Sequence, residues 1–232
     1  MAHSSVLSFF DKTDSRQGDF MDAAVVETSR RPFITTVTTL AVLLLGALAA
    51  LSELVQAWMT ITGRYLYTSG GAEPRKPVVD LPQLLQAEVR EGYTMFLDDV
   101  PAALRVLAAT PALLAAITYL IASVLLARAI RSIAAGDAFG RRVRSTLTWL
   151  SATLLVGGLL QGAVDSAAGA ALWSWFPRAT DLGGTHELAI AGLGLDVPHW
   201  PVMIVVLGLV TSALTVAFQQ GARLQEETDG LV

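Results

Sequence analysis

Four long runs of apolar residues, each almost free of charge, constrain this chain more than any other feature of its sequence. The hydrocarbon core of a bilayer takes about 20 apolar residues in a helix, which bonds its backbone groups internally. The runs cover about 33–59, 104–130, 147–172 and 201–219. Only 16% of the 232 residues are charged, whereas soluble domains carry about 25%. The sequence therefore predicts an all-α membrane protein, with a four-helix transmembrane domain over 33–219.

The distribution of arginine predicts which side of the membrane each link faces, because basic residues are enriched in short cytoplasmic loops. Five arginines cluster in and beside the short link 131–146, against the single acid Asp137: Arg128, Arg131, Arg141, Arg142 and Arg144. This link is expected in the cytoplasm, and four spans then place both termini there. The polar tail 1–32 and the tail 220–232 are therefore predicted to be cytoplasmic, and the first run an uncleaved membrane helix.

The other two links, 60–103 and 177–200, are expected to form a small layer on the opposite side of the membrane. Apolar residues between Leu81 and Phe96 recur at roughly helical spacing and predict a short amphipathic helix. The apolar runs Pro77–Asp80 and Leu188–Ala191 are bounded by turn residues, and we expect them to pair as two short strands.

Two segments expected in the cytoplasm carry a family resemblance. One is Ala129–Phe139, which reads AIRSIAAGDAF, and the other is Phe218–Val232, which reads FQQGARLQEETDGLV. From about residue 33 onward, the chain resembles the bacterial domain-of-unknown-function family numbered 2975. The resemblance implies four spans in the bacterial plasma membrane, a Gly-x-x-Phe inner loop and an acidic tail. It implies no established activity, although some members are thought to sit beside a helix-turn-helix regulator.

Asp165 and Glu53 are the only acids predicted to lie within the apolar runs. An ionisable group at membrane depth costs at least about 2.5–3.5 kcal/mol on insertion scales, which makes both acids functional candidates. Gln161 lies one helical turn before Asp165, and Gln56 accompanies Glu53 in the same way. One hypothesis is a proton or cation site shared by the two acids. The other, which we favour, places both near the outer interface, in contact with water or a hydroxyl group.

The third run carries a stripe of small residues on one helical face, here called the glycine stripe: Gly158, Gly162, Ser166 and Gly169. Small residues let helices approach closely. The stripe predicts packing inside the bundle, which is the commoner case, or against another subunit. The five arginines allow contact with anionic lipid headgroups or with a cytoplasmic partner, but the simplest interpretation is that they set the topology.

No motif in the sequence indicates catalysis, a cofactor or a metal. The absence of cysteine excludes disulfides, thiolate metal sites and thiol catalysis. His186 and His199 lack the further ligands that zinc needs at characteristic spacings. A net charge of −4 gives no basic field for nucleic acid. We therefore expect a protein that is not an enzyme, with no cofactor, no metal and no nucleic-acid partner.

Three functions remain open on these features. The first is a non-catalytic accessory or structural subunit of a larger cytoplasmic-membrane complex, such as a respiratory one. Its partners would be membrane lipids and other membrane subunits, or further copies of this chain. The second is a membrane-embedded sensor or regulator that signals to a cytoplasmic partner. The third is a small oligomeric transporter or channel that uses Asp165 and Glu53.

Overall fold

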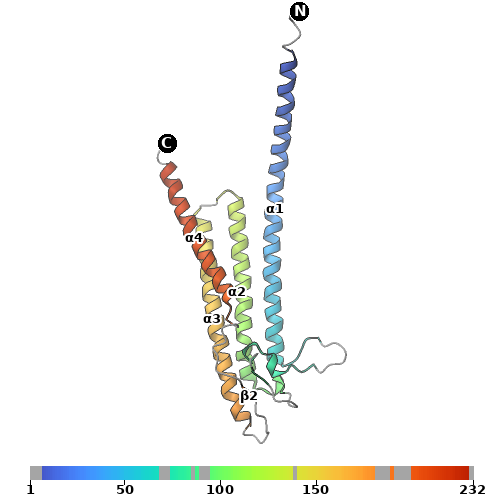
Figure 1. The fold of residues 1–232 in the computed structure, drawn as a ribbon, viewed down its shortest axis with the longest axis vertical. Coiled ribbons are helices and arrows are strands. Elements are labelled where there is room, and N and C mark those ends of the chain that lie inside the picture. The colour runs from blue at the N-terminus through green and yellow to red at the C-terminus, as the bar shows by residue number, and fades with distance from the viewer. Residues whose placement is uncertain are drawn as a thin grey trace, which may run out of the picture.

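The computed structural model describes residues 7–67, 74–84, 87–88, 95–137, 140–180, 189–190 and 200–229. Within these ranges the chain forms four long helices that alternate in direction (Figure 1). They are α1 (Leu7–Thr62), α2 (Ala102–Ala134), α3 (Arg141–Thr180) and α4 (Val202–Asp229). Each contains a segment long and apolar enough to cross a membrane: Phe33–Thr62, Ala102–Ala134, Arg141–Trp175 and Val202–Arg223. The predicted all-α, multi-pass membrane fold is confirmed.

Helix α1 is much longer than the span that it contains. It begins at Leu7, so most of the 1–32 tail belongs to the same helix as the first span, and it projects well beyond the other helices (Figure 1). It ends at Gly63, whose φ of +69° lies in the left-handed region that glycine adopts without strain. The Gly63 amide donates a 2.9 Å hydrogen bond to the carbonyl of Met59, which closes the last turn.

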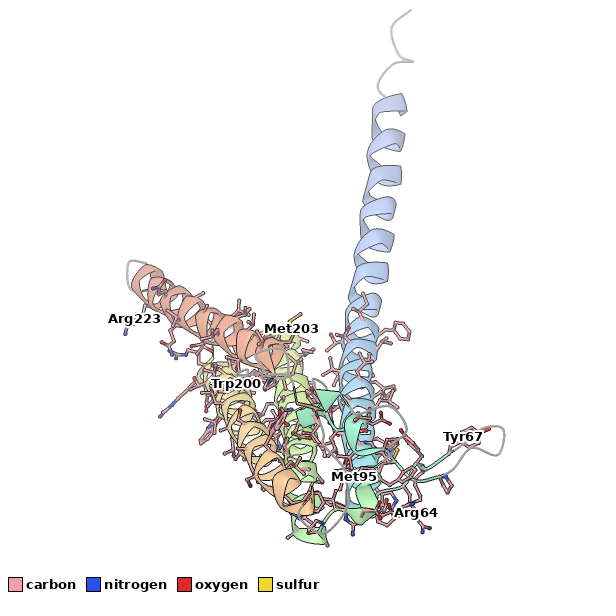
Figure 2. All side chains as sticks on the ribbon, turned by 60° about the horizontal axis from the view of Figure 1, so that its bottom comes forward. Arg64, Tyr67, Met95, Trp200, Met203 and Arg223 are labelled. Atoms are coloured by element: carbon pink, nitrogen blue, oxygen red, sulfur yellow. The ribbon has the colours of Figure 1, made fainter. Side chains whose placement is uncertain are left out.

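The bundle packs in chain order. The extensive helix–helix contacts among the described residues join α1 to α2, α2 to α3 and α3 to α4. Each contact includes a glycine where a Cβ atom would meet the neighbouring helix: Gly46 at Ser123, Gly157 at Thr118, and Gly208 at Leu155. Helices α1 and α4 therefore stand at opposite ends of an open row, as both views show (Figures 1 and 2).

The link between α2 and α3 is shorter than expected, because both helices extend into it and leave only 135–140 between them. Gly136 ends α2 with a φ of +89°, and its amide bonds back to the carbonyl of Ile133. Just before α3, the carboxylate of Asp137 occupies the position that a Cβ atom on Gly140 would take. The arginines of the predicted loop consequently lie on the two helix ends.

Five further described segments gather at the other end of the bundle and are here called the outer layer: 63–67, 74–84, 87–88, 95–101 and 189–190. They contain three short 3-10 turns, η1 (Val78–Asp80), η2 (Pro82–Leu84) and η3 (Leu97–Asp99). They also contain two short antiparallel strands, β1 (Ala87–Glu88) and β2 (Ala189–Ile190), in which Ala87 faces Ile190.

Two expectations for this layer are corrected. The amphipathic helix predicted from Leu81 onward is wrong over 81–88, where the 3-10 turn η2 is followed by strand β1. The predicted strand Leu188–Ala191 contains β2, but its partner is Ala87–Glu88 and not Pro77–Asp80. The physical reason is that 76–78 already pairs with 95–97: the Val78 amide donates to Met95, and the Leu97 amide donates to Lys76.

A small apolar core ties the outer layer to the membrane helices. Its layer side consists of Val78, Leu81, Leu84, Leu97 and Val100, all at most 3% exposed. Ala108 of α2 and Leu172 of α3 complete it. Leu81 and Leu84, which suggested one face of a helix, belong to this shared core, so burial and not helical periodicity explains their spacing.

Candidate functional site

Asp165 of α3 is bound by the outer layer. The side-chain amide of Gln83 in η2 donates a 2.6 Å hydrogen bond to Asp165 Oδ1 and a 3.2 Å hydrogen bond to the carbonyl oxygen of Ala108 on α2. Pro111, inside α2, has no N–H for the carbonyl one turn before it, which loosens the helix at this level. One glutamine thus joins the outer layer to α3 and α2.

The position of α4 indicates the depth of Asp165. The indole ring of Trp200, just before α4, packs against Gly162, and Figure 2 shows Trp200 at the start of that helix. Tryptophan rings collect at membrane interfaces. Asp165 lies three residues past Gly162, or about 4.5 Å farther toward the outer layer. Its described partner is a glutamine amide and not the water or hydroxyl group of the interfacial alternative, and its depth in the membrane stays a prediction.

Glu53 lies in a different environment, in a groove along α1. The groove has a volume of about 550 Å³, and its described lining comes entirely from α1: Leu48, Leu51, Ser52, Glu53, Val55, Gln56 and Met59. Gln56 therefore accompanies Glu53 as expected. Gly46 of α1 lies level with Ser123 of α2, and Thr118, five residues earlier in α2, lies level with Gly157 of α3. Counting residues along the helices from these two contacts places Glu53 near the level of Leu159 on α3. That level is about 4.5 Å from Gly162, on the side away from the outer layer.

The described contacts do not join the two acids in one site. Asp165 is bound to Gln83, whereas no residue of α3 lines the described wall of the Glu53 groove. Gln161, one turn before Asp165, has a buried side-chain oxygen without a hydrogen-bond partner among the described residues. The sequence missed Gln83, because a glutamine in a turn carries no signal of its partner across the fold.

The glycine stripe packs inside this chain. A Cβ atom on Gly158 would lie 3.0 Å from Val205 on α4, and one on Gly162 would lie 2.9 Å from the Trp200 ring. Gly169, farther along, faces Gln83. The Ser166 hydroxyl donates to the carbonyl of Gly162 in its own helix. The stripe therefore brings α3 close to α4 and to the outer layer.

The five arginines lie at the opposite end of the bundle. Arg128 and Arg131 are exposed near the end of α2, and Arg141 and Arg142 are exposed at the start of α3. Arg144 is partly buried, and its Nε atom has no hydrogen-bond partner among the described residues. Cations favour helix C-termini and disfavour N-termini, so the arginines of α3 stand against the helix dipole. Arg131, in the last turn of α2, favours the dipole of that helix, so the positive charge serves helix stability on α2 and not on α3.

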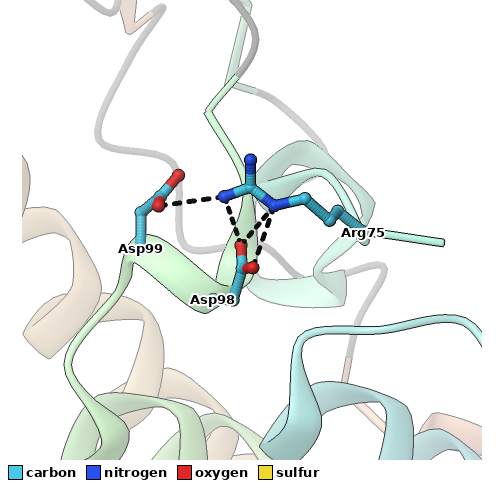
Figure 3. Close-up of polar contacts among 3 residues, drawn as sticks. All are labelled: Arg75, Asp98 and Asp99. Atoms are coloured by element: carbon cyan, nitrogen blue, oxygen red, sulfur yellow. Dashed lines mark hydrogen bonds and ion pairs between the residues drawn. The ribbon is translucent and has the colours of Figure 1, made fainter. Parts of the chain in front are cut away.

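A clamp of charged residues that the sequence did not predict holds the outer layer together (Figure 3). Arg75 donates from Nη2 to Asp98 at 2.7 Å and from Nε to Asp98 at 2.9 Å. It also reaches Asp99 at 3.0 Å, and its guanidinium lies 4.1 Å from the centre of the Phe96 ring. The hydrogen bonds from Arg75 lower the pKa of the Asp98 carboxyl, more than its partial burial raises it.

A buried lysine lies beside this clamp. Lys76 is 2% exposed, and its burial lowers the pKa of its ammonium group, an effect that the charge of Asp80 partly opposes. The hydroxyl of Tyr65 donates a hydrogen bond to Asp80. Burial, and then this bond to Asp80, raise the pKa of Tyr65 to about 12. These charges hold the layer in one arrangement but converge on no cavity of the described residues.

Within the described residues, no three histidines, cysteines or acids are close enough to hold a metal ion. His186 and His199 lie outside the described residues. No family model, curated protein or solved structure matches this chain. The resemblance to the four-span family numbered 2975 accordingly stays a prediction.

Proposed function

We propose that this chain is a non-catalytic accessory subunit of a larger complex in the bacterial plasma membrane. The open row of helices carries the proposal. In the most apolar window of α1 only 11% of residues are buried, against 33% in α2 and α3. Among the described residues α1 packs mainly along α2 and α4 mainly along α3, so much of the apolar surface of each end helix is available to lipid and to other subunits.

The extension of α1 supports the same proposal. It continues for about 39 Å from Phe33 to Leu7 at 1.5 Å per residue. A single helix that is not packed on anything is marginal in water, and a partner is the usual source of its stability. Its sequence includes large apolar side chains that suit such a partner: Phe9, Phe10, Phe20 and Met21.

A second candidate, the membrane sensor, is favoured by one specific contact. Gln83 ties the outer layer to α2 and α3, and the same two helices carry the arginines at the other end. A ligand that displaced the layer would act directly on both helices. The transporter hypothesis gains no such support, because Asp165 and Glu53 lie in separate environments.

Native mass spectrometry of the protein, purified in mild detergent from its own host, tests the proposal. A stoichiometric complex with other membrane proteins is expected. Photo-crosslinking residues placed at the exposed Leu40 on α1 and Leu209 on α4 should reach those partners, whereas one at the buried Ala50 should not. A chain that is only monomeric or self-associated would overturn the proposal and leave the sensor as the leading candidate.

A further inference from the structure

The groove on α1 combines polar and apolar walls at membrane depth. Its polar part is Ser52, Glu53 and Gln56, and its apolar part includes Leu48 and Leu51 on the side away from the outer layer. From Leu48 to Met59 the lining extends about 16 Å along the helix axis. The polar part lies near the level of Trp200, with Leu48 and Leu51 on the side toward the middle of the bilayer and Met59 on the side toward the outer layer.

Among the residues that the structure describes, no cation pairs with the polar groups of this groove. Among the described residues, Glu53 forms no ion pair, and neither Ser52 nor Gln56 forms a side-chain hydrogen bond. Tyr119 of α2 lies within electrostatic range of Glu53 but is a neutral side chain. A carboxylate without a nearby cation is costly at this depth, so a donor from another molecule would stabilise it.

We propose that this groove binds a phospholipid with a primary ammonium headgroup. Such a headgroup has three N–H donors, as a lysine ammonium does. The groove offers it three acceptors: the Glu53 carboxylate, the Gln56 amide oxygen and the Ser52 hydroxyl. One acyl chain then lies along Leu48 and Leu51. A quaternary ammonium headgroup has no N–H and satisfies none of these acceptors by hydrogen bonding.

Two other occupants fit the groove less well. A second copy of this chain, packed α1 to α1 about a two-fold axis, would bring two Glu53 carboxylates together, and like charges repel. A hydrated divalent cation keeps several water molecules, whereas most of the lining is leucine, valine and methionine. The mixture of three polar and four apolar side chains matches a molecule with a polar head and an apolar chain.

Lipid titration followed by native mass spectrometry tests the assignment. The detergent-purified chain is mixed with phosphatidylethanolamine, phosphatidylcholine or phosphatidylglycerol of identical acyl chains. We expect about tenfold tighter binding of the ethanolamine lipid, the preference that a charge-assisted contact supplies. Glu53→Gln should bring the ethanolamine and choline lipids to equal affinity, and Glu53→Asp should retain part of the preference.

Two leucine variants locate the binding site. Leu51→Trp fills the groove and should abolish the tight binding, whereas Leu45→Trp, at an exposed α1 position outside the groove, should not. Unchanged thermal unfolding verifies that each variant folds. Equal binding of ethanolamine and choline lipids by the unmodified chain would overturn the proposal. A preference that survives Glu53→Gln, or tighter binding of the glycerol lipid, would do so as well.

Discussion

Gln83 and Asp165, 82 positions apart in the chain, are joined by a 2.6 Å hydrogen bond from the glutamine amide to the carboxylate. The same amide reaches the carbonyl of Ala108. This pair connects the outer layer to two membrane helices at the level where Pro111 interrupts the backbone bonding of α2. It also gives an acid within a predicted apolar run a partly buried polar partner in its own chain.

Gln83→Leu should loosen the outer layer. The variant removes a hydrogen bond to a charged group, a loss of about 1.5–3 kcal/mol. Hydrogen exchange should become faster at the amide of Leu84, which bonds to Leu81 in the same turn. Asp165→Asn keeps an acceptor oxygen and should have a smaller effect. Gln219→Leu, at an exposed position on α4, serves as the control, and equal exchange in both glutamine variants would contradict the structural role.

Gly46→Ala should separate α1 from α2. The new methyl group would overlap Ser123 Cβ and Oγ, and such overpacking costs about 1–3 kcal/mol. Adding Ser123→Gly removes both atoms and leaves the Tyr119 carbonyl at 3.5 Å, an ordinary contact. The double variant should therefore recover most of the thermal stability in detergent. Additive losses in the two single variants, with no recovery, would show that the helices do not meet at this point.

The clamp between Arg75 and Asp98 should make the outer layer sensitive to acid. Because the folded pKa of Asp98 is below its usual value, the clamp stabilises the folded layer fully above about pH 4. That stability is lost as the pH falls through the lower folded pKa. Asp98→Asn should flatten the thermal-stability profile below pH 4. Asp99→Asn, whose side chain is 54% exposed against 26% for Asp98, should change it less.

Lys76→Met should stabilise the protein at neutral pH. Burial lowers the folded pKa of this lysine, so its charged form costs folding free energy below that pKa. The cost disappears as the pH rises from the folded pKa toward the usual value of 10.5. Replacing the ammonium with an apolar side chain of similar length should gain on the order of 1 kcal/mol at pH 7. A lower melting temperature would mean that the ammonium makes a required contact.

Cysteine labelling tests the predicted topology without background, because the chain has no cysteine. Tyr67→Cys, at an exposed position in the outer layer, should react with a membrane-impermeant maleimide on intact cells. Ala135→Cys, in the link between α2 and α3, should react only after permeabilisation, since the arginines beside it favour the cytoplasm. Figure 2 shows Tyr67 at the tip of a described segment that projects away from α1. The opposite labelling pattern would reverse the topology.

The sequence by itself determined the four spans, because a helix must bury about 20 apolar residues to cross the bilayer, and that requirement is local. It also located the glycines of α3 that let α4 approach, since small side chains are visible as a pattern. It determined neither the end of α2 nor the start of α3 to within a turn. Helix ends depend on single contacts such as the Gly136 amide with the Ile133 carbonyl.

Only the tertiary structure decided what the acids contact and how the outer layer folds. Leu81 and Leu84 have a spacing that suits a helix, yet a core shared with Leu97 and with Leu172 of α3 holds them at the 3-10 turns η1 and η2. Asp165 contacts Gln83, whereas Glu53 lies in a separate groove on α1. Both placements follow from the packing of the bundle as an open row and not from any local pattern. Contacts between distant segments follow from shape and burial, which periodicity along one segment does not encode.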